Sequence, residues 1–329
     1  MAAATIRDVA RQAGVSVASV SRALNGHTNV HPDTRALVAA AAKALGYVPH
    51  AGARSLSMAR SHAIGVVLPD LHGEFFSEIV RGMDREAHAR GYQLLLSNMH
   101  ADIELAGHAM RAMRGRVDGL VVMAPQVDPV LLGETLPRDV PTVLIHSPDG
   151  TGHHSMRADS RRGADTMVRH LVDAGCKHIV HLAGPVDNID GRDRRAGFEA
   201  AMASVAPAQP ATVVQGDFTE EAGERAVAML LAEGSPVDAI FAANDMMALG
   251  ALYALRQAGV AVPGRIAVAG FDDVPMARHL TLTTMRVRMA DLGARAIARL
   301  VAELDGSATS PAAELVDPEL VVRGTTRAR

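Results

Sequence analysis

The chain has 329 residues, which is too long for one ordinary hydrophobic core and suits two or three domains. Apolar residues make up 48% of it, yet no stretch reaches the roughly 18 apolar residues of a membrane span, and we expect no signal peptide. Net charge is −3, but residues 1–60 carry +5 and the remainder carries −8. A basic segment on an acidic body indicates a polyanionic partner for that segment, with chance clustering as the alternative.

The first 25 residues predict two short helices. Thr5 with Asp8 three places later satisfies the free amide donors of a helix start, as in a capping box. Gly14 ends this helix, because glycine tolerates a positive φ. Ser16 then caps a second helix, which we expect at 17–24.

A third helix is expected to begin at Pro32 and to stop at Gly46. Its predicted inward-facing side chains are Leu37, Val38, Ala41 and Leu45. Two short helices with a tight turn, supported by a third, form a DNA-reading unit. The alternative is a small three-helix bundle with a solvated polar face, and helix patterning alone leaves both open.

The second predicted helix carries polar and basic side chains away from its apolar stripe, and their donors and acceptors suit phosphates and base edges. Residues 5–25 (TIRDVARQAGVSVASVSRALN) resemble the N-terminal signature of the lactose-repressor/galactose-repressor (LacI/GalR) family. The resemblance implies that Val17 and Ala18 help to choose the operator and that Arg22 reads a guanine. The DNA-binding residues expected from the pattern and the resemblance are Thr5, Ile6, Ser16, Val17, Ala18, Ser19, Ser21, Arg22, Asn25, Asn29, Arg54 and Leu56.

The segment after the third helix resembles the hinge helix of the same family at Ala53-Arg54-Ser55-Leu56. Leu56 occupies the position of the leucine that enters the minor groove in that family, where an apolar wedge opens a base step. The alternative for Leu56 is a linker leucine that rests on the body. Because the segment is short and contains Gly52, we expect it to fold only on the operator, in a dimer.

From residue 64 onward, short apolar runs alternate with helical stretches. The expected strands lie at 64–68, 93–97, 119–123, 142–146, 178–183, 212–215, 239–242 and 266–270. Near-continuous Val, Ile and Leu runs between helices predict parallel sheets that are covered on both faces. Two sets of about four strands indicate two doubly wound α/β lobes, whose shared cleft lies beyond the carboxyl ends of the strands.

This body resembles the type I periplasmic-binding-protein-like body of the same family across residues 62–325, through motifs at 117–120, 182–185, 191–198, 243–250 and 270–273. The expected domains are an all-α helix-turn-helix domain at 1–49, a hinge helix or linker at 50–61, and an effector-binding and dimerisation domain at 62–329. The N-lobe is expected at about 62–158 and 288–318, and the C-lobe at about 159–287 and 319–329.

The resemblance places Arg194, Asn244 and Asp272 at the family's polar effector contacts. The guanidinium, amide and carboxylate groups of these three residues together suit the vicinal diols of a sugar. The effector-binding residues expected are Asp70, Phe75, Phe76, His146, Arg194, Phe218, Asn244 and Asp272. Ordinary core phenylalanines are the alternative for the three aromatics, and a purely structural ion pair is the alternative for Arg194 with Asp272. Departures from the family at His146, Met123 and Ala101 argue against transferring any one member's sugar.

No residue set carries catalysis. We interpret the single cysteine, Cys176, as a lone half-buried thiol, which fits a reducing compartment, so we expect a cytoplasmic protein. His153 and His154 are adjacent in a Gly-rich loop, and His178 and His181 fall on opposite faces of a strand, so neither pair forms a metal site. Without a phosphate-binding glycine loop or a nucleophile elbow, we expect no enzyme, no metal and no cofactor.

The sequence predicts a DNA-binding transcriptional regulator, in the family's manner a repressor. It would bind a pseudo-palindromic operator as a homodimer without a membrane partner, and a sugar-like small molecule would control it. A regulator that responds to a nucleobase or nucleoside is the first alternative. A sugar-binding transport receptor and an α/β enzyme of sugar or nucleoside metabolism are the alternatives from other classes.

Overall fold

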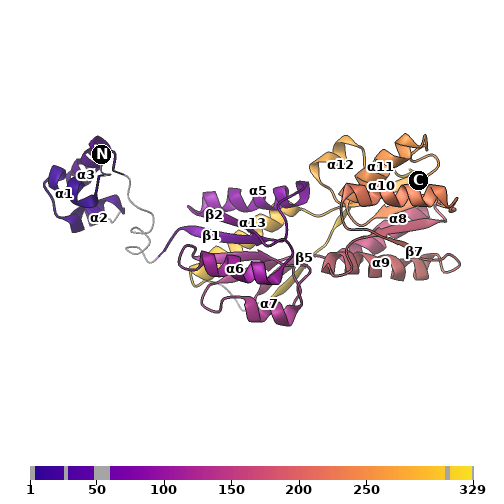
Figure 1. The fold of residues 1–329 in the computed structure, drawn as a ribbon, viewed down its shortest axis with the longest axis horizontal. Helices are drawn as coiled ribbons and strands as arrows, with labels where there is room; N and C mark the ends of the chain where they lie inside the picture. The colour runs from indigo at the N-terminus through magenta and orange to yellow at the C-terminus, as the bar shows by residue number, and fades with distance from the viewer. Residues whose placement is uncertain (1–3, 26–28, 48–59, 308–311, 328–329) are drawn as a thin grey trace. The chain divides into compact units, whose positions relative to one another are not determined.

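The computed structural model describes residues 4–25, 29–47, 60–307 and 312–327 (Figure 1). It divides into two compact units. One comprises Met1–Ala63 with Gly115–Asp118, and the other comprises Ile64–Arg114 with Gly119–Arg329. The hinge segment expected at 50–61, with Arg54 and Leu56, lies almost wholly outside the described residues.

The N-terminal unit contains the three predicted helices, which are α1 (Ile6–Ala13), α2 (Val17–Leu24) and α3 (Pro32–Ala44). Asp8 accepts hydrogen bonds from the Thr5 amide at 3.0 Å and from the Thr5 hydroxyl at 2.7 Å. Gly14 ends α1 with a φ of 66°, and the Ser16 hydroxyl oxygen accepts from the Ser19 amide. The predicted caps are therefore confirmed.

The core of this small unit differs from the prediction in α3. Val38, Ala41 and Ala42 are buried there, whereas Leu37 is 57% exposed. Our inward placement of Leu37 was wrong, because the alanine-rich α3 has apolar residues on every side and its sequence does not fix which face is inward. The inward face is the one that meets Val9 and Val20 of the neighbouring helices.

The larger unit contains two six-stranded sheets. The first has the order β11-β5-β4-β3-β1-β2, with strands β1 (Ala63–Leu68), β2 (Gln93–Asn98), β3 (Gly119–Met123), β4 (Thr142–Ile145), β5 (His154–Ala158) and β11 (Ala313–Val316). The second has the order β12-β10-β9-β8-β6-β7, with strands β6 (Ile179–Ala183), β7 (Thr212–Gln215), β8 (Ala239–Ala242), β9 (Ala267–Asp272), β10 (Thr283–Arg286) and β12 (Glu319–Val321). The recorded pairings are parallel, apart from the antiparallel pair of β10 and β12.

All eight predicted strands form, but each sheet has two more strands than the sequence indicated. The strand β5 was missed because it opens with His154 and Ser155, which are buried although polar. Their hydrogen bonds explain this burial: the Ala312 amide donates to His154 Nδ1, and the Ser155 hydroxyl donates to Asp149. His154 therefore belongs to a strand and not to the Gly-rich loop that we expected.

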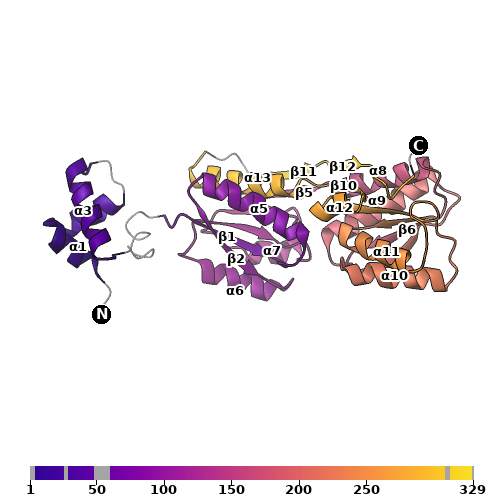
Figure 2. The same ribbon diagram turned by 90° about the horizontal axis from the view of Figure 1, so that it is seen from above.

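Helices cover both faces of each sheet. They are α5 (Glu74–Ala89), α6 (Ile103–Met113), α7 (Pro129–Thr135), α8 (Ser160–Asp173), α9 (Ile189–Val205), α10 (Glu220–Ala232), α11 (Asp245–Gln257), α12 (Pro275–His279) and α13 (Met289–Leu304). In the first sheet, α5 and α13 lie on one face and α6 and α7 on the other (Figure 1). In the second, α8 and α9 lie opposite α10 and α11 (Figure 2). This is the doubly wound arrangement that parallel sheets require.

Glycines allow the closest helix contact of the first lobe. A Cβ at Gly82 of α5 would lie 1.8 Å from the Ala290 carbonyl oxygen, and one at Gly293 of α13 would lie 2.3 Å from the Ile79 carbonyl oxygen. The chain passes between the two sheets after Ala158, after Arg286 and after Val316. None of the helices in the described ranges is long and apolar enough to cross a membrane.

Candidate functional site

The helix α2 divides its side chains between the core and solvent. Val20 and Ala23 are buried, whereas Val17 is 42% exposed and Ala18 and Arg22 are also exposed. The outward residues are those expected to face DNA, since an i, i+3 apolar stripe fixes one face of a helix inward. The structure thus presents a small apolar pair and a guanidinium on one short, capped helix.

The other expected DNA-binding residues differ in exposure. Thr5, Ser16 and Asn29 are exposed, and Ile6, Ser19, Ser21 and Asn25 are half-buried. The Ser16 and Ser19 hydroxyls lie 3.0 Å apart, and the Ser19 amide donates to Ser16 Oγ at 3.1 Å. Ser16 therefore has a structural task as the cap of α2, independent of any contact with DNA.

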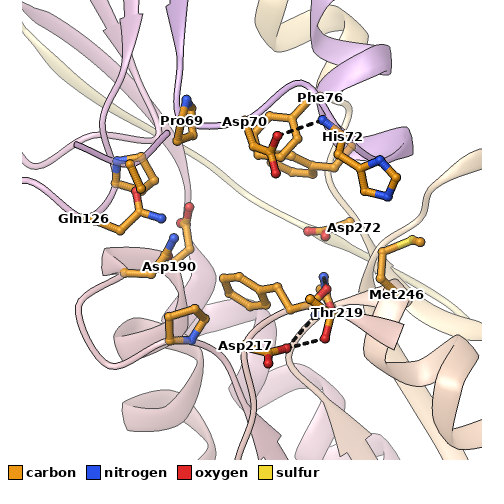
Figure 3. A pocket seen from close by; sticks show the side chains of 18 of the residues that line it. Pro69, Asp70, His72, Phe76, Gln126, Asp190, Asp217, Thr219, Met246 and Asp272 are labelled. Carbon is orange, nitrogen blue, oxygen red and sulfur yellow. Dashed lines mark hydrogen bonds between the residues drawn. The ribbon is translucent and has the colours of Figure 1, made fainter. Parts of the chain in front are cut away.

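A cavity of about 610 Å³ opens where strands of both sheets end (Figure 3). The segment after β1 contributes Asp70, His72 and Phe76, and Asp217, Thr219 and Met246 from the second lobe face them (Figure 3). Its lining is Pro69, Asp70, His72, Gly73, Phe75, Phe76, His100, Ala101, Met123, Pro125, Gln126, Pro185, Asn188, Asp190, Arg194, Asp217, Phe218, Thr219, Glu220, Glu221, Asn244, Met246 and Asp272. The carboxyl ends of parallel strands are where such sheets bind ligands.

All the expected effector-binding residues line this cavity except His146. His146 is fully buried just after β4. Its Nδ1 lies 2.8 Å from Asp190 Oδ2, and its ring meets the edge of Phe75 with centroids 5.3 Å apart. His146 thus lies behind the wall and contacts two lining residues, Asp190 and Phe75. Met123 and Ala101 are also part of the wall, as expected.

Arg194, on α9, is held rigidly at the base of the cavity. It donates to the Ala243 carbonyl oxygen at 2.5 Å, to Asp272 Oδ1 at 3.1 Å and to Ser160 Oγ at 3.4 Å. Its guanidinium also lies over the Phe271 ring, 3.9 Å from the centroid. A guanidinium with this many contacts is pre-organised, so a ligand need not order it.

The two buried carboxyl groups of the cavity have opposite pKa shifts. Burial raises the pKa of Asp272 to about 6, although Arg194 and His146 favour its ionised form. Burial also disfavours the ionised form of Asp190, but His146, Arg194 and Ser160 outweigh it and hold the pKa of Asp190 well below its ordinary value. Asp190 is thus a carboxylate at neutral pH, whereas Asp272 titrates close to neutrality.

Asn244 is the N-cap of α11 as well as a lining residue. Its Oδ1 accepts from the Met247 amide at 2.9 Å, and its Nδ2 donates to the Phe218 carbonyl oxygen at 3.0 Å. The Phe218 ring in turn lies against Gly184, where an added Cβ would come within 2.3 Å of the ring carbons. The side chain of Asn244 therefore caps α11 and also holds the backbone of Phe218.

Backbone strain gathers around the cavity. Outside glycine, positive φ angles occur at lining residues His100, Ala101, Phe218 and Asp272, and at His146 behind the wall. Side chains rarely adopt this region without compensation, and such strain clusters at ligand-binding sites. Asp272 has a φ of 113°, and its Oδ1 accepts from Arg194 at 3.1 Å.

Sequence reasoning missed several lining residues, above all Asp190, Gln126 and Glu221. Asp190 lies in the first turn of α9, the helix that follows the strand predicted at 178–183. An acid at a helix start after a parallel strand was the available signal. It was overlooked because acids in a first helical turn are ordinary stabilisers of helices.

Two sequence profiles match the chain. That of the bacterial regulatory proteins of the lacI family matches residues 5–50, and that of a periplasmic binding protein-like domain matches residues 168–326. The first covers the helical N-terminal unit with α2, and the second covers most of the lobe that contributes Arg194, Asn244 and Asp272.

Whole-length relatives agree with the profiles. The ribose operon repressor of Escherichia coli (strain K12) is 35% identical over 98% of this chain and 99% of that protein. The crystal structure of the Lac repressor dimer bound to operator and the anti-inducer ONPF superposes with a TM-score of 0.90 at 30% identity, covering 99% of this chain and 100% of that one. The complex of the transcriptional regulator CelR with cellobiose superposes with a TM-score of 0.72 at 30% identity, covering 98% and 99%. The chain therefore belongs to the lacI family of bacterial regulatory proteins.

Proposed function

We propose that the chain is a transcriptional repressor that reads operator DNA with α2 and binds a sugar-like effector in the cavity between its two sheets. The observation that carries this is the pairing of two sites in one chain. A capped helix exposes Val17, Ala18 and Arg22, and a separate pre-organised cavity has Arg194 and Asp272 at its base. An enzyme or a transport receptor would need the cavity but not the exposed helix.

A sugar fits the chemistry of the cavity. Arg194 supplies donors, while Asp190 and Asp272 supply acceptors for hydroxyl groups. The rings of Phe75 and Phe76 meet edge to face with centroids 5.4 Å apart, and they offer an apolar wall for the C–H face of a sugar ring. The cellobiose complex of CelR and the name of the ribose operon repressor support this ligand class.

The proposed repressor is a homodimer, as the structural relative solved as a dimer on its operator is. The edge strand β2 exposes Leu95 and Leu96, and α6 beside it exposes Leu105. Exposed apolar side chains on a sheet edge need cover, and a second copy of the chain would supply it symmetrically. Two copies of α2 would then read two half-sites.

The proposed division of labour follows the expected domains: DNA binding at 1–49, a hinge at 50–61 and effector binding with dimerisation at 62–329. One contact lies where the hinge enters the body. Asp118 accepts hydrogen bonds from the amides of Ser61 and His62 at 2.6 and 2.8 Å, and from the Ser61 hydroxyl at 2.8 Å. Asp118 would thus anchor the end of the hinge.

A binding-site selection from random duplexes tests the DNA-binding part. We expect a dyad-symmetric consensus with half-sites one helical turn apart. Arg22→Ala should lose preference for one guanine in each half-site and weaken binding by roughly 1–3 kcal/mol. If the selected duplexes lack dyad symmetry, or if Arg22→Ala selects the same consensus, the assignment of α2 as the reading helix is wrong.

A further inference from the structure

The charge of the effector cavity indicates which ligands it admits. Its lining contains one guanidinium, that of Arg194, and six carboxyl groups: Asp70, Asp190, Asp217, Glu220, Glu221 and Asp272. His72 and His100 are the other titratable lining residues. Even with both histidines protonated, carboxyl groups outnumber positive charges. An anionic ligand would therefore enter an acidic chamber.

The single guanidinium is already matched inside the protein. Arg194 pairs with Asp272, with both side chains at least 94% buried. Ser160 links Arg194 to Asp190: its hydroxyl oxygen accepts from Arg194 Nε, and its hydroxyl donates to Asp190 at 3.1 Å. A phosphate group would have to compete with Asp272 for Arg194, and it would then leave a buried carboxylate without its partner, which is costly.

The helix α10 points its first turn at the cavity, and such a terminus ordinarily attracts anions. Here Glu220 and Glu221 occupy the first two helical positions and line the cavity themselves. Among the described residues, no side chain or amide donates a hydrogen bond to either carboxylate. The helix N-terminus thus already has negative charge beside it, from Glu220 and Glu221.

Acceptors also exceed donors deeper in the cavity. Gln126 lines the cavity, and among the described residues its Oε1 is buried without a hydrogen-bond partner. A buried oxygen without a donor is costly, and a ligand that brings O–H or N–H groups removes that cost. The cavity therefore favours ligands rich in donors.

We propose that the cavity selects a polyhydroxylated ligand without any anionic group, and that an ammonium-bearing form binds at least as tightly as its neutral parent. This inference rests on the proposed function of the cavity and narrows its ligand class. Phosphorylated sugars and nucleotides are excluded by the same charges that attract amino sugars. The mouth residues Glu220 and Glu221 are the specificity-determining pair.

The test uses matched ligand series with the full-length chain. Calorimetric titration compares glucose with glucosamine and glucose 6-phosphate, galactose with galactosamine and galactose 6-phosphate, and ribose with ribose 5-phosphate. In every series that binds, we expect the phosphate ester to bind at least about tenfold more weakly than the neutral sugar. We expect the amino sugar to bind no more weakly, and the difference to shrink as salt rises.

The variant Glu220→Gln/Glu221→Gln should reduce the discrimination between neutral sugar and phosphate ester. Glu224→Gln, one turn further along α10 and outside the lining, is the matched control and should keep it. A phosphate ester that binds as tightly as its parent overturns the proposal, and so does the absence of binding in every series. Operator binding by the same preparation is measured by gel shift, so failure of the ligand class is distinguished from failure of the regulator assignment.

Discussion

Asp272 is the residue whose ionisation should control effector binding. Its raised pKa, about 6 against an ordinary 3.8, means that the folded ligand-free chain holds this proton more tightly than the unfolded chain does. Stability from this group is therefore fully present below about pH 4 and is lost as the pH rises to about 6. Ligand hydroxyl groups that donate to the carboxylate oppose this loss, because they stabilise the ionised form.

We expect the affinity for a sugar to rise between pH 5 and pH 7, with a midpoint near the pKa of about 6. Titration calorimetry across this range measures it. Asp272→Asn should bind weakly and flatten the profile, whereas Glu224→Gln, on α10 and outside the lining, should keep it. An affinity that falls with rising pH in the wild-type chain would instead mean that protonated Asp272 donates to the ligand.

Gly184 should be indispensable for the aromatic wall. A Cβ there would come within 2.3 Å of the Phe218 ring, so Gly184→Ala must displace that ring, which lines the cavity. We expect at least about a tenfold loss of effector affinity, equivalent to 1.4 kcal/mol, with operator binding unchanged. Gly133→Ala is the control, because its Cβ would meet nothing closer than 3.8 Å. Unchanged calorimetric affinity in Gly184→Ala would remove Phe218 from the proposed wall.

The sequence could identify Arg194, Asn244 and Asp272 because they stand in motifs that resemble the family. It could not show that Asn244 also holds the Phe218 carbonyl, because that bond joins residues 26 positions apart. The pairing of His146 with Asp190 was hidden for the same reason, since 44 residues separate them. The residues of the site could thus be predicted from the sequence, whereas their long-range hydrogen bonds could be seen only in the folded structure.

At the scale of elements, α12 begins without a cap of its own. Its N-cap is Val274, which has no side-chain acceptor, and the Met276 amide donates instead to Glu74 Oε2 at 2.8 Å. Glu74 opens α5 on the other lobe, so this bond joins the two lobes beside the cavity. The Met276 amide at the start of α12 therefore keeps its hydrogen-bond acceptor only while the two lobes are close together.

We therefore expect Glu74→Ala to favour separated lobes and to weaken effector binding. A lost cap costs roughly 0.5–2 kcal/mol, so the dissociation constant should rise by a few-fold to about thirtyfold. Glu78→Ala, one turn along α5, where Glu78 pairs with Arg81, is the matched control. Equal calorimetric affinities for the two variants would show that the bond does not help to close the cavity.

Element prediction succeeded where burial and composition agree. The strands β1, β3 and β8 are entirely buried and entirely apolar, and their sequence runs were recognised. The missed strands β11 and β12 lie at sheet edges with exposed residues, and both are only three or four residues long. Short edge strands carry no continuous apolar run, because one side of them faces solvent.

At the scale of the whole molecule, assembly should depend on the exposed edge at β2. Leu96→Glu places a charge on the exposed edge strand β2, so we expect monomers by analytical ultracentrifugation and much weaker operator binding. Val130→Glu on α7 is the control, because Val130 is 68% exposed yet lies on another helix. A dimeric Leu96→Glu variant with normal operator affinity would place the interface elsewhere.

The central claim is that a ligand in the cavity changes the affinity of the chain for its operator. The most direct measurement is fluorescence anisotropy of a labelled dyad-symmetric operator, titrated with the chain with and without a saturating sugar identified by calorimetry. We expect the sugar to change the operator dissociation constant of the wild-type chain by about 5- to 150-fold, the range of allosteric coupling of 1–3 kcal/mol. Asp272→Ala should bind the operator equally well and ignore the sugar. A sugar that saturates the wild-type cavity and leaves its operator affinity unchanged would contradict the claim.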